Sequence, residues 1–136
     1  MKEIIVDSDI LSYYFKKHKI VAKNFNDYIN KKRYVYISRI TVYEILSGLK
    51  SKDAKRQLEE FRKFLEKNKI LELTAKSVEI SSDIFADLRQ KGKTTGSSDI
   101  LIAGIAISND LKLSTNNIKD YENIPNLELI NWTKIK

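Results

Sequence analysis

The 136-residue sequence contains no cysteine, one proline, four glycines and one histidine. Without cysteine the protein cannot contain a disulfide framework, a thiolate zinc site or a cysteine nucleophile. The absence of cysteine also fits a reducing compartment, so we expect a cytoplasmic location. No apolar run approaches the roughly 20 residues that span a bilayer, and the amino-terminal segment lacks the apolar stretch of a secretory signal. These absences predict a soluble protein that is neither exported nor held in a membrane.

What remains is sufficient for a folded domain. Hydrophobic residues make up 42% of the chain and charged residues 32%, a balance that is typical of globular proteins and not of disordered or fibrous ones. A chain of this length matches one compact domain, and we expect residues 1–136 to form a single domain.

Positive charge is in excess and unevenly distributed. The formal net charge is +7, and residues 1–70 carry 17 lysines and arginines against 9 acidic residues, whereas the remainder carries 8 against 9. A basic half is typical of proteins that bind polyanions. The alternative is a lysine-rich surface that serves solubility alone.

Alternating strand-like and helical segments predict the fold class. Short runs rich in β-branched and other apolar residues predict strands at 3–6, 34–38, 70–73, 112–114 and 127–130. Helical spacing of apolar residues predicts helices after Asp7, at 20–31, 39–49 and 53–68, after Thr74, and from Ser97 or Ser98 as cap to residue 107. The last of these is apolar nearly all round and should be buried. The segment 116–125 is turn-rich. Strands separated by helices predict an α/β fold, with a central parallel sheet of about five short strands and helices on both faces.

Acidic residues occur where such a sheet would bring them to one cleft. Asp7 and Asp9 follow the first predicted strand, Glu44 lies on the helix after the second, and Asp99 opens the buried helix. Ligands of parallel sheets bind at the carboxyl ends of the strands, where the strand order reverses. Each acid also has a structural explanation: Asp7 as a helix cap, Asp99 as a partner of the helix dipole, and Glu44 as a solvated side chain.

Carboxylates that share a cleft repel one another unless a cation compensates them. Mg²⁺ suits such a site because it prefers oxygen ligands, keeps several waters and commonly bridges carboxylates to phosphate oxygens. The pattern therefore points to phosphate-ester chemistry. Zinc fits less well, because cysteine is absent and the only histidine, His18, stands among lysines where we expect a surface position.

Several segments resemble the motifs of PIN-domain nucleases, and the resemblance extends over essentially the whole chain. They are residues 4–11, 37–48, 88–103, and the closing segments 113–121 and 127–132, which look like those of VapC-type toxins. Each motif is short and weakly specific, but their shared order and spacing is specific. The resemblance implies a PIN-like (Rossmann-like) fold.

The same resemblance implies an Mg²⁺- or Mn²⁺-dependent endoribonuclease, the toxin of a toxin–antitoxin pair. Such toxins are usually dimeric and are inhibited by a VapB-like antitoxin whose tail enters the active site. Matched to the family's motifs, Asp7, Glu44 and Asp99 fall on the three most characteristic acidic positions. Many PIN domains place an aspartate where this sequence has Asn117, so Asp120 is the candidate fourth acid. This departure leaves open whether the site holds one metal ion or two.

The expected reaction is hydrolysis of an RNA phosphodiester by a water that the cation activates, which leaves a 5′-phosphate and a 3′-hydroxyl. Asp7 and Asp99 are the expected chief metal ligands, while Glu44, and Asp120 with it, hold metal-bound waters or orient the nucleophile. Polar neighbours support the acids by hydrogen bonds, or serve as helix-cap and turn residues instead: Ser8, Asp9, Thr115, Asn116 and Asn117.

Basic residues near the second and third predicted helices are candidate contacts for RNA phosphates. They are Lys31, Lys32, Arg33, Arg39 and Lys50. Tyrosines interleaved among them, including Tyr43, either stack on bases or form the margin of the core.

Apolar faces that a small chain cannot cover predict a homodimer surface and an antitoxin groove, the alternative being a complete monomer. Two other functions fit the same fold: a housekeeping nuclease that processes RNA or acts on DNA, and a non-catalytic module that binds RNA or a partner.

Overall fold

The computed structural model describes residues 2–135. Its elements are, in chain order, β1 (Ile4–Val6), α1 (Ser8–Phe15), α2 (Lys19–Lys32), β2 (Tyr36–Ser38), α3 (Arg39–Ser51), α4 (Lys55–Glu66), β3 (Lys69–Leu71), α5 (Ala75–Gln90), α6 (Ser97–Ser108), β4 (Lys112–Ser114), α7 (Ile118–Tyr121) and β5 (Leu129–Ile130). No helix within residues 2–135 is long and apolar enough to cross a membrane.

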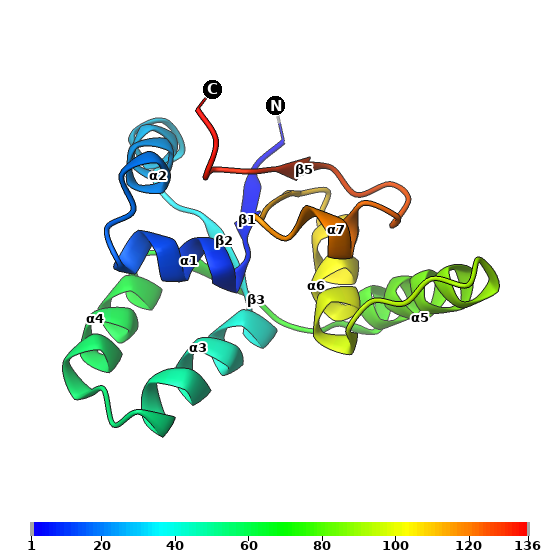
Figure 1. The fold of residues 1–136 in the computed structure, drawn as a ribbon, viewed down its shortest axis with the longest axis horizontal. Helices are drawn as coiled ribbons and strands as arrows, with labels where there is room; N and C mark the ends of the chain where they lie inside the picture. The colour runs from blue at the N-terminus through cyan, green and yellow to red at the C-terminus, as the bar shows by residue number, and fades with distance from the viewer. Residues whose placement is uncertain (1, 136) are drawn as a thin grey trace.

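The five strands form one parallel sheet in the order β3-β2-β1-β4-β5. The central strand is β1, in which Ile5 lies opposite Tyr36 of β2 and Leu113 of β4. The strand order therefore reverses between β1 and β4. Helices α1 to α4 lie on one side of the strands, and α5 to α7 lie on the other side (Figure 1). This arrangement confirms the predicted α/β fold.

Each face of the sheet has its own apolar core, because successive side chains of a strand point to opposite faces. Ile5 and Leu113 pack into one core with α5 and α6. Ile4 and Val6 face the other core, which includes Phe25 of α2 and Phe61 of α4. Helix α6 is buried along most of its length, as its apolar sequence predicts.

The crossing of α5 and α6 is close because residue 104 has no side chain. A Cβ placed on Gly104 would lie 2.0 Å from the Ser81 Oγ and 2.6 Å from the backbone oxygen of Ser77. The Ser81 hydroxyl also donates to the Ile100 carbonyl at 3.0 Å. Small residues thus allow the two helices to meet backbone to backbone.

We expect Gly104→Ala to lower the free energy of unfolding by about 1–3 kcal/mol, because the new methyl group meets backbone that cannot rotate away. Urea unfolding followed by circular dichroism measures this loss. The matched control is Gly48→Ala at an exposed position of α3, where a Cβ meets nothing within 4 Å and the substitution should stabilise the helix by about 0.5–1 kcal/mol. Equal stabilities of Gly104→Ala and wild type would contradict the close crossing.

Two local predictions are wrong. Helix α6 has Gly96 as its N-cap with no side-chain cap, so neither Ser97 nor Ser98 caps it, and Ser97 already lies inside the helix. The segment 116–125, predicted as turns, contains the short helix α7. This helix forms because Tyr121 and Ile124 are drawn into the core beside α6, a tertiary contact that local sequence does not reveal.

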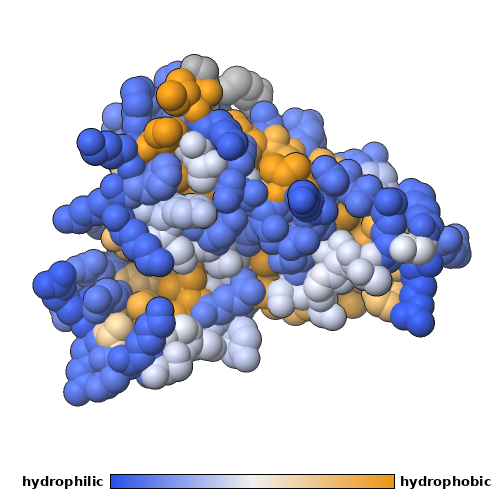
Figure 2. Space-filling view, in the orientation of Figure 1, coloured by the Kyte–Doolittle hydropathy of each residue, from blue (hydrophilic) through white to orange (hydrophobic). Residues whose placement is uncertain are grey.

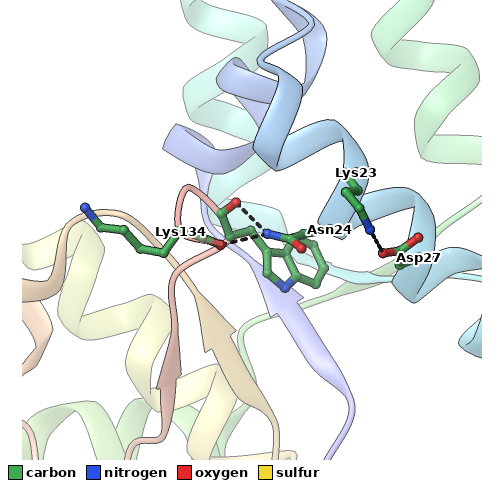
Figure 3. Close-up of polar contacts among 5 residues, drawn as sticks. Lys23, Asn24, Asp27 and Lys134 are labelled. Atoms are coloured by element: carbon green, nitrogen blue, oxygen red, sulfur yellow. Dashed lines mark hydrogen bonds and ion pairs between the residues drawn. The ribbon is translucent and has the colours of Figure 1, made fainter. Parts of the chain in front are cut away.

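The chain after β5 is fixed to α2. Asn24, which is buried, donates through Nδ2 to the carbonyl oxygens of Trp132 and Lys134, at 3.0 Å each (Figure 3). The fully buried Trp132 ring packs against Phe25 and Tyr28, with ring centroids 5.4 and 5.5 Å apart. The carboxyl-terminal segment is therefore an integral part of the core on this face.

The surface in the view of Figure 2 is mostly hydrophilic, and apolar residues appear between α3 and α4. Half-buried apolar side chains on these two helices pack only partly against the core: Ile45, Leu46, Leu49, Phe64 and Leu65. The space between α3 and α4 is thus an incompletely covered apolar surface.

Candidate active site

The acidic residues meet at the carboxyl ends of β1 and β4, where the strand order reverses. Asp7 directly follows β1 and caps α1, since its Oδ1 accepts the Ser8 N–H at 2.9 Å. Glu44 lies on α3, which follows β2, and Asp99 lies in the first turn of α6. The first turns of α1 and α6 and the helix α3 therefore bring side chains that are far apart in sequence to one end of the sheet.

Asp7 is buried, with 4% of its surface exposed, and hydroxyl groups surround its carboxylate. Its Oδ2 accepts the Thr115 hydroxyl at 2.9 Å and the Tyr121 hydroxyl at 3.1 Å. The cap and the acidic-site interpretations of Asp7 therefore both apply: Oδ1 caps α1, Oδ2 accepts the two hydroxyls, and the carboxylate lies among the other acids.

Tyr121 is the site residue that sequence reasoning missed. Its hydroxyl lies between two acids, 3.1 Å from Asp7 Oδ2 and 2.9 Å from Asp99 Oδ1. The apolar spacing of Ile118, Tyr121 and Ile124 was a signal for a buried ring, but nothing in the sequence indicates what the hydroxyl contacts.

Burial and mutual repulsion act together on four carboxyl groups. Burial is the first cause that raises the pKa of Asp7, and the charge of Asp9 adds to it. The pKa of Asp9 is raised by burial and by Asp99, against hydrogen bonds from the backbone of Asn116 and Ile10.

The pKa of Glu44 is raised by burial and then by Asp7, Asp99 and Asp9, while the Ser8 hydroxyl acts in the opposite direction. Burial also raises the pKa of Asp99, with added repulsion from Asp7 and Asp120 and an opposing hydrogen bond from Tyr121. The four acids thus lie close enough to sense one another's charge.

No basic side chain neutralises this cluster: among residues 2–135, no lysine or arginine forms an ion pair with Asp7, Asp9, Glu44 or Asp99. In addition, Glu44 Oε1 is buried without a hydrogen-bond partner. Uncompensated carboxylates and an unpaired buried oxygen are the donor set that a hard cation requires.

The described residues contain no group of three or more Asp, Glu, His or Cys side chains close enough to form a ready-made metal centre. Mg²⁺ does not need one, because it is commonly held by one or two carboxylates and several waters. The acids therefore fit Mg²⁺ chemically, in an open arrangement.

The polar residues around the acids form a connected rim. The backbone N–H of Asn116 donates to Asp9 Oδ2 at 3.0 Å, and Asn131 donates through Nδ2 to Asn116 Oδ1 at 2.9 Å. Asn117 donates its backbone N–H to the Thr115 hydroxyl at 3.0 Å and its side-chain amide to Asp120 Oδ2. Asn117, which stands where many PIN domains have an acid, thus holds Asp120 at the edge of the site.

Most of the predicted RNA-contacting cations lie elsewhere. Lys31 and Lys32 form the last turn of α2 and Arg33 is its C-cap, so they lie at the amino ends of the strands, opposite the acids. Arg39 lies at the acidic end, but its Nε and Nη2 donate to the Glu72 carboxylate, with Nη2 at 2.5 Å from Oε2. Lys50 is exposed near the end of α3.

His18, expected at the surface, is half-buried and structural. Its Nδ1 accepts the Val21 N–H at 3.2 Å and so caps α2. Its ring also contacts Tyr13, with the ring centroids 5.2 Å apart.

Comparisons with known proteins show which family the sequence belongs to. The model of the PIN domain family matches residues 4–125. Ribonuclease VapC2 of Rickettsia felis is 34% identical over 131 residues, which cover 96% of this chain and 98% of the relative. The tRNA(fMet)-specific endonuclease VapC of Salmonella typhimurium is 30% identical over 134 residues, which cover 97% and 99%.

Solved structures agree with the sequence relatives. The crystal structure of VapBC2 from Rickettsia felis bound to a promoter DNA fragment contains a similar chain, with a TM-score of 0.84, 32% identity and coverage of 95% of this chain and 98% of that one. The DNA-bound VapBC from Salmonella typhimurium gives a TM-score of 0.86 at 28% identity, covering 97% and 99%. Fold, family model and full-length relatives agree, and the chain belongs to the PIN-domain family and, within it, to the VapC-type ribonucleases.

Proposed function

We propose that the protein is an Mg²⁺-dependent endoribonuclease that acts as the toxin of a toxin–antitoxin pair. The observation that carries the proposal is the set of uncompensated, mutually repelling carboxylates at the reversal point of the sheet, Asp7, Asp9, Glu44 and Asp99. Relatives over nearly the full length of the chain are named ribonucleases and an endonuclease specific for tRNA(fMet), which supports RNA as the substrate.

Three of these acids have distinct roles in this proposal. Asp7 and Asp99 would hold the cation, since the Tyr121 hydroxyl that both contact keeps the two carboxylates at one place. Glu44, with its unpaired Oε1, would accept a proton or hydrogen bond from the attacking water, and a raised pKa suits a general base. When bound, Mg²⁺ supplies charge that stabilises the phosphoryl oxygens and favours ionisation of water; Mn²⁺ has similar ligand preferences.

The RNA side of the site has one aromatic candidate. Tyr43, adjacent to Glu44 on α3, is 70% exposed, and an exposed aromatic ring near the scissile bond suits stacking on an unpaired base. Lys50 on the same helix would contribute charge, whereas Lys31, Lys32 and Arg33 lie at the other end of the sheet, where only an RNA that wraps around the molecule would reach them.

A cognate antitoxin is the proposed protein partner. The similar solved chains come from VapBC complexes, and the partly covered apolar surface between α3 and α4 is suited to an apolar segment of such a partner (Figure 2). A homodimer, or a larger toxin–antitoxin assembly, is the expected oligomeric state.

Cleavage of an RNA panel tests the function. The antitoxin-free protein should cut one or more of transfer, ribosomal and messenger RNAs in Mg²⁺, leave 5′-phosphate and 3′-hydroxyl ends, and lose activity in EDTA. Asp99→Asn should cut at least about 100-fold more slowly. Asp83→Asn changes an exposed side chain of α5, removes an equal charge away from the site and should match wild type. Undiminished cleavage in EDTA, or 2′,3′-cyclic phosphate ends, would contradict the proposal.

A further inference from the structure

The Tyr121 hydroxyl is placed between the two acids that we expect to hold the cation. It contacts Asp7 Oδ2 at 3.1 Å and Asp99 Oδ1 at 2.9 Å. In the sequence, Tyr121 is 114 positions from Asp7 and 22 positions from Asp99. No other side chain of residues 2–135 hydrogen-bonds to both of these carboxylates. Tyr121 therefore links Asp7 and Asp99 through a single hydroxyl.

The single hydroxyl proton lies between one oxygen of each carboxylate, Asp7 Oδ2 and Asp99 Oδ1, and the other oxygen of each carboxylate makes no contact with Tyr121. Asp7 Oδ1 accepts only the Ser8 N–H among the described residues. Asp99 Oδ2 accepts no hydrogen bond within residues 2–135, and it faces Gly96, where an added Cβ would lie 3.8 Å away. By holding Asp7 Oδ2 and Asp99 Oδ1, Tyr121 orients the remaining oxygens for a ligand.

Tyr121 can act in this way because it is itself held in place. Its side chain is fully buried in the core that α6 helps to form. Its helix α7 is tied to the loop before α6, since the Thr95 hydroxyl donates to the Asp120 carbonyl at 3.0 Å. The Asn117 amide also donates to the Asp120 carboxylate within α7. The phenol therefore cannot turn away from the acids toward water.

We propose that Tyr121 is a positioning residue for the cation: its hydroxyl holds Asp7 and Asp99 at the separation and orientation at which both carboxylates bind one metal ion. This role rests on the proposed function. Partners that orient metal ligands commonly change metal affinity by about 10- to 100-fold when they are removed.

The test removes only the hydroxyl, in Tyr121→Phe, and measures Mn²⁺ binding by electron paramagnetic resonance and Mg²⁺ binding by calorimetry. We expect metal affinity to fall about tenfold. The metal concentration that gives half-maximal RNA cleavage should rise by the same factor, and cleavage should recover toward wild type at saturating metal. A purely structural hydroxyl would instead change stability without changing metal affinity.

Tyr28→Phe is the matched control, because the Tyr28 hydroxyl accepts the N–H of Ile4 at 2.9 Å, on the strand that leads to Asp7 but away from the acids. Its metal affinity should equal that of wild type. Equal affinities of Tyr121→Phe and wild type, or tighter binding by Tyr121→Phe, would overturn the positioning role.

If Tyr121→Phe does not fold, the ultraviolet difference spectrum of the wild-type protein tests the positioning role instead. The tyrosine absorption should change as Mg²⁺ is added, with the same half-saturation as metal binding, and a spectrum that stays constant while the metal binds would overturn the role. Metal binding by the Asp99→Asn protein distinguishes a failure of the positioning role of Tyr121 from a failure of the proposed function. If Mn²⁺ binds wild type and Tyr121→Phe equally but not Asp99→Asn, only the positioning role fails; if Mn²⁺ binds none of them, the proposed function fails as well.

Discussion

Asp7→Asn is expected to reduce RNA cleavage by at least about 100-fold while leaving the metal-free protein as stable as wild type, or more stable. The two effects have one cause. Asp7 is a buried acid whose pKa is raised by its surroundings, so its charge at neutral pH works against folding. The same charge is what the cation requires. Function and stability therefore make opposite demands on this position.

The asparagine can satisfy the hydrogen bonds of the aspartate it replaces. Its carbonyl oxygen can still accept the Ser8 N–H, and its amide can donate to the Thr115 and Tyr121 hydroxyl oxygens, which in wild type donate to Asp7 Oδ2. Hydroxyl oxygens accept as well as donate. No buried polar atom needs to lose its partner, which is why we expect no loss of stability.

Initial cleavage rates in Mg²⁺ and urea unfolding in EDTA measure the two effects on the same protein. Asp83→Asn, an exposed substitution of the same type on α5, should leave cleavage unchanged. Cleavage at the wild-type rate by folded Asp7→Asn would exclude Asp7 from the active site. A large loss of stability would instead show that the folded state depends on the charge of the Asp7 carboxylate.

Mg²⁺ is expected to stabilise the protein at neutral pH far more than at acidic pH. The folded-state pKa values of Asp7, Asp9 and Asp99 lie above the ordinary value of 3.8, and that of Glu44 lies above 4.5. An acid with a raised folded-state pKa favours folding fully below its ordinary pKa, and this contribution is lost as the pH rises through the raised value. From these groups, the metal-free protein should lose stability as the pH rises from about 4 toward neutral.

A bound cation compensates the buried, mutually repelling charges that cause this loss. At 100 times its dissociation constant, a ligand that binds only the folded state stabilises it by about 2.7 kcal/mol. Thermal unfolding with and without Mg²⁺ across this pH range measures the effect, and Asp7→Asn should show a shallower dependence on pH. The Glu72 carboxyl, whose pKa is lowered by Arg39, works in the opposite direction, but the pair is exposed and contributes little. An equal shift in Tm with Mg²⁺ at pH 4 and pH 7 would contradict the prediction.

The sequence by itself determined the α/β fold, and it predicted that three of the acids in the cluster lie close together. Strands such as Ile4–Val6 and the apolar helix from Ser97 are short-range patterns, because side-chain periodicity follows directly from backbone geometry. The prediction that Asp7, Glu44 and Asp99 lie near one another followed because parallel strands end at a common edge, so that a residue's place after a strand predicts its place in space.

Only the tertiary structure decided which partners these residues have. The contact of Tyr121 with Asp7 spans 114 positions, and Arg39 is paired with Glu72 across 33. Such contacts depend on the packing of whole elements against one another, and this packing is set by the sum of many distant side chains rather than by any local pattern.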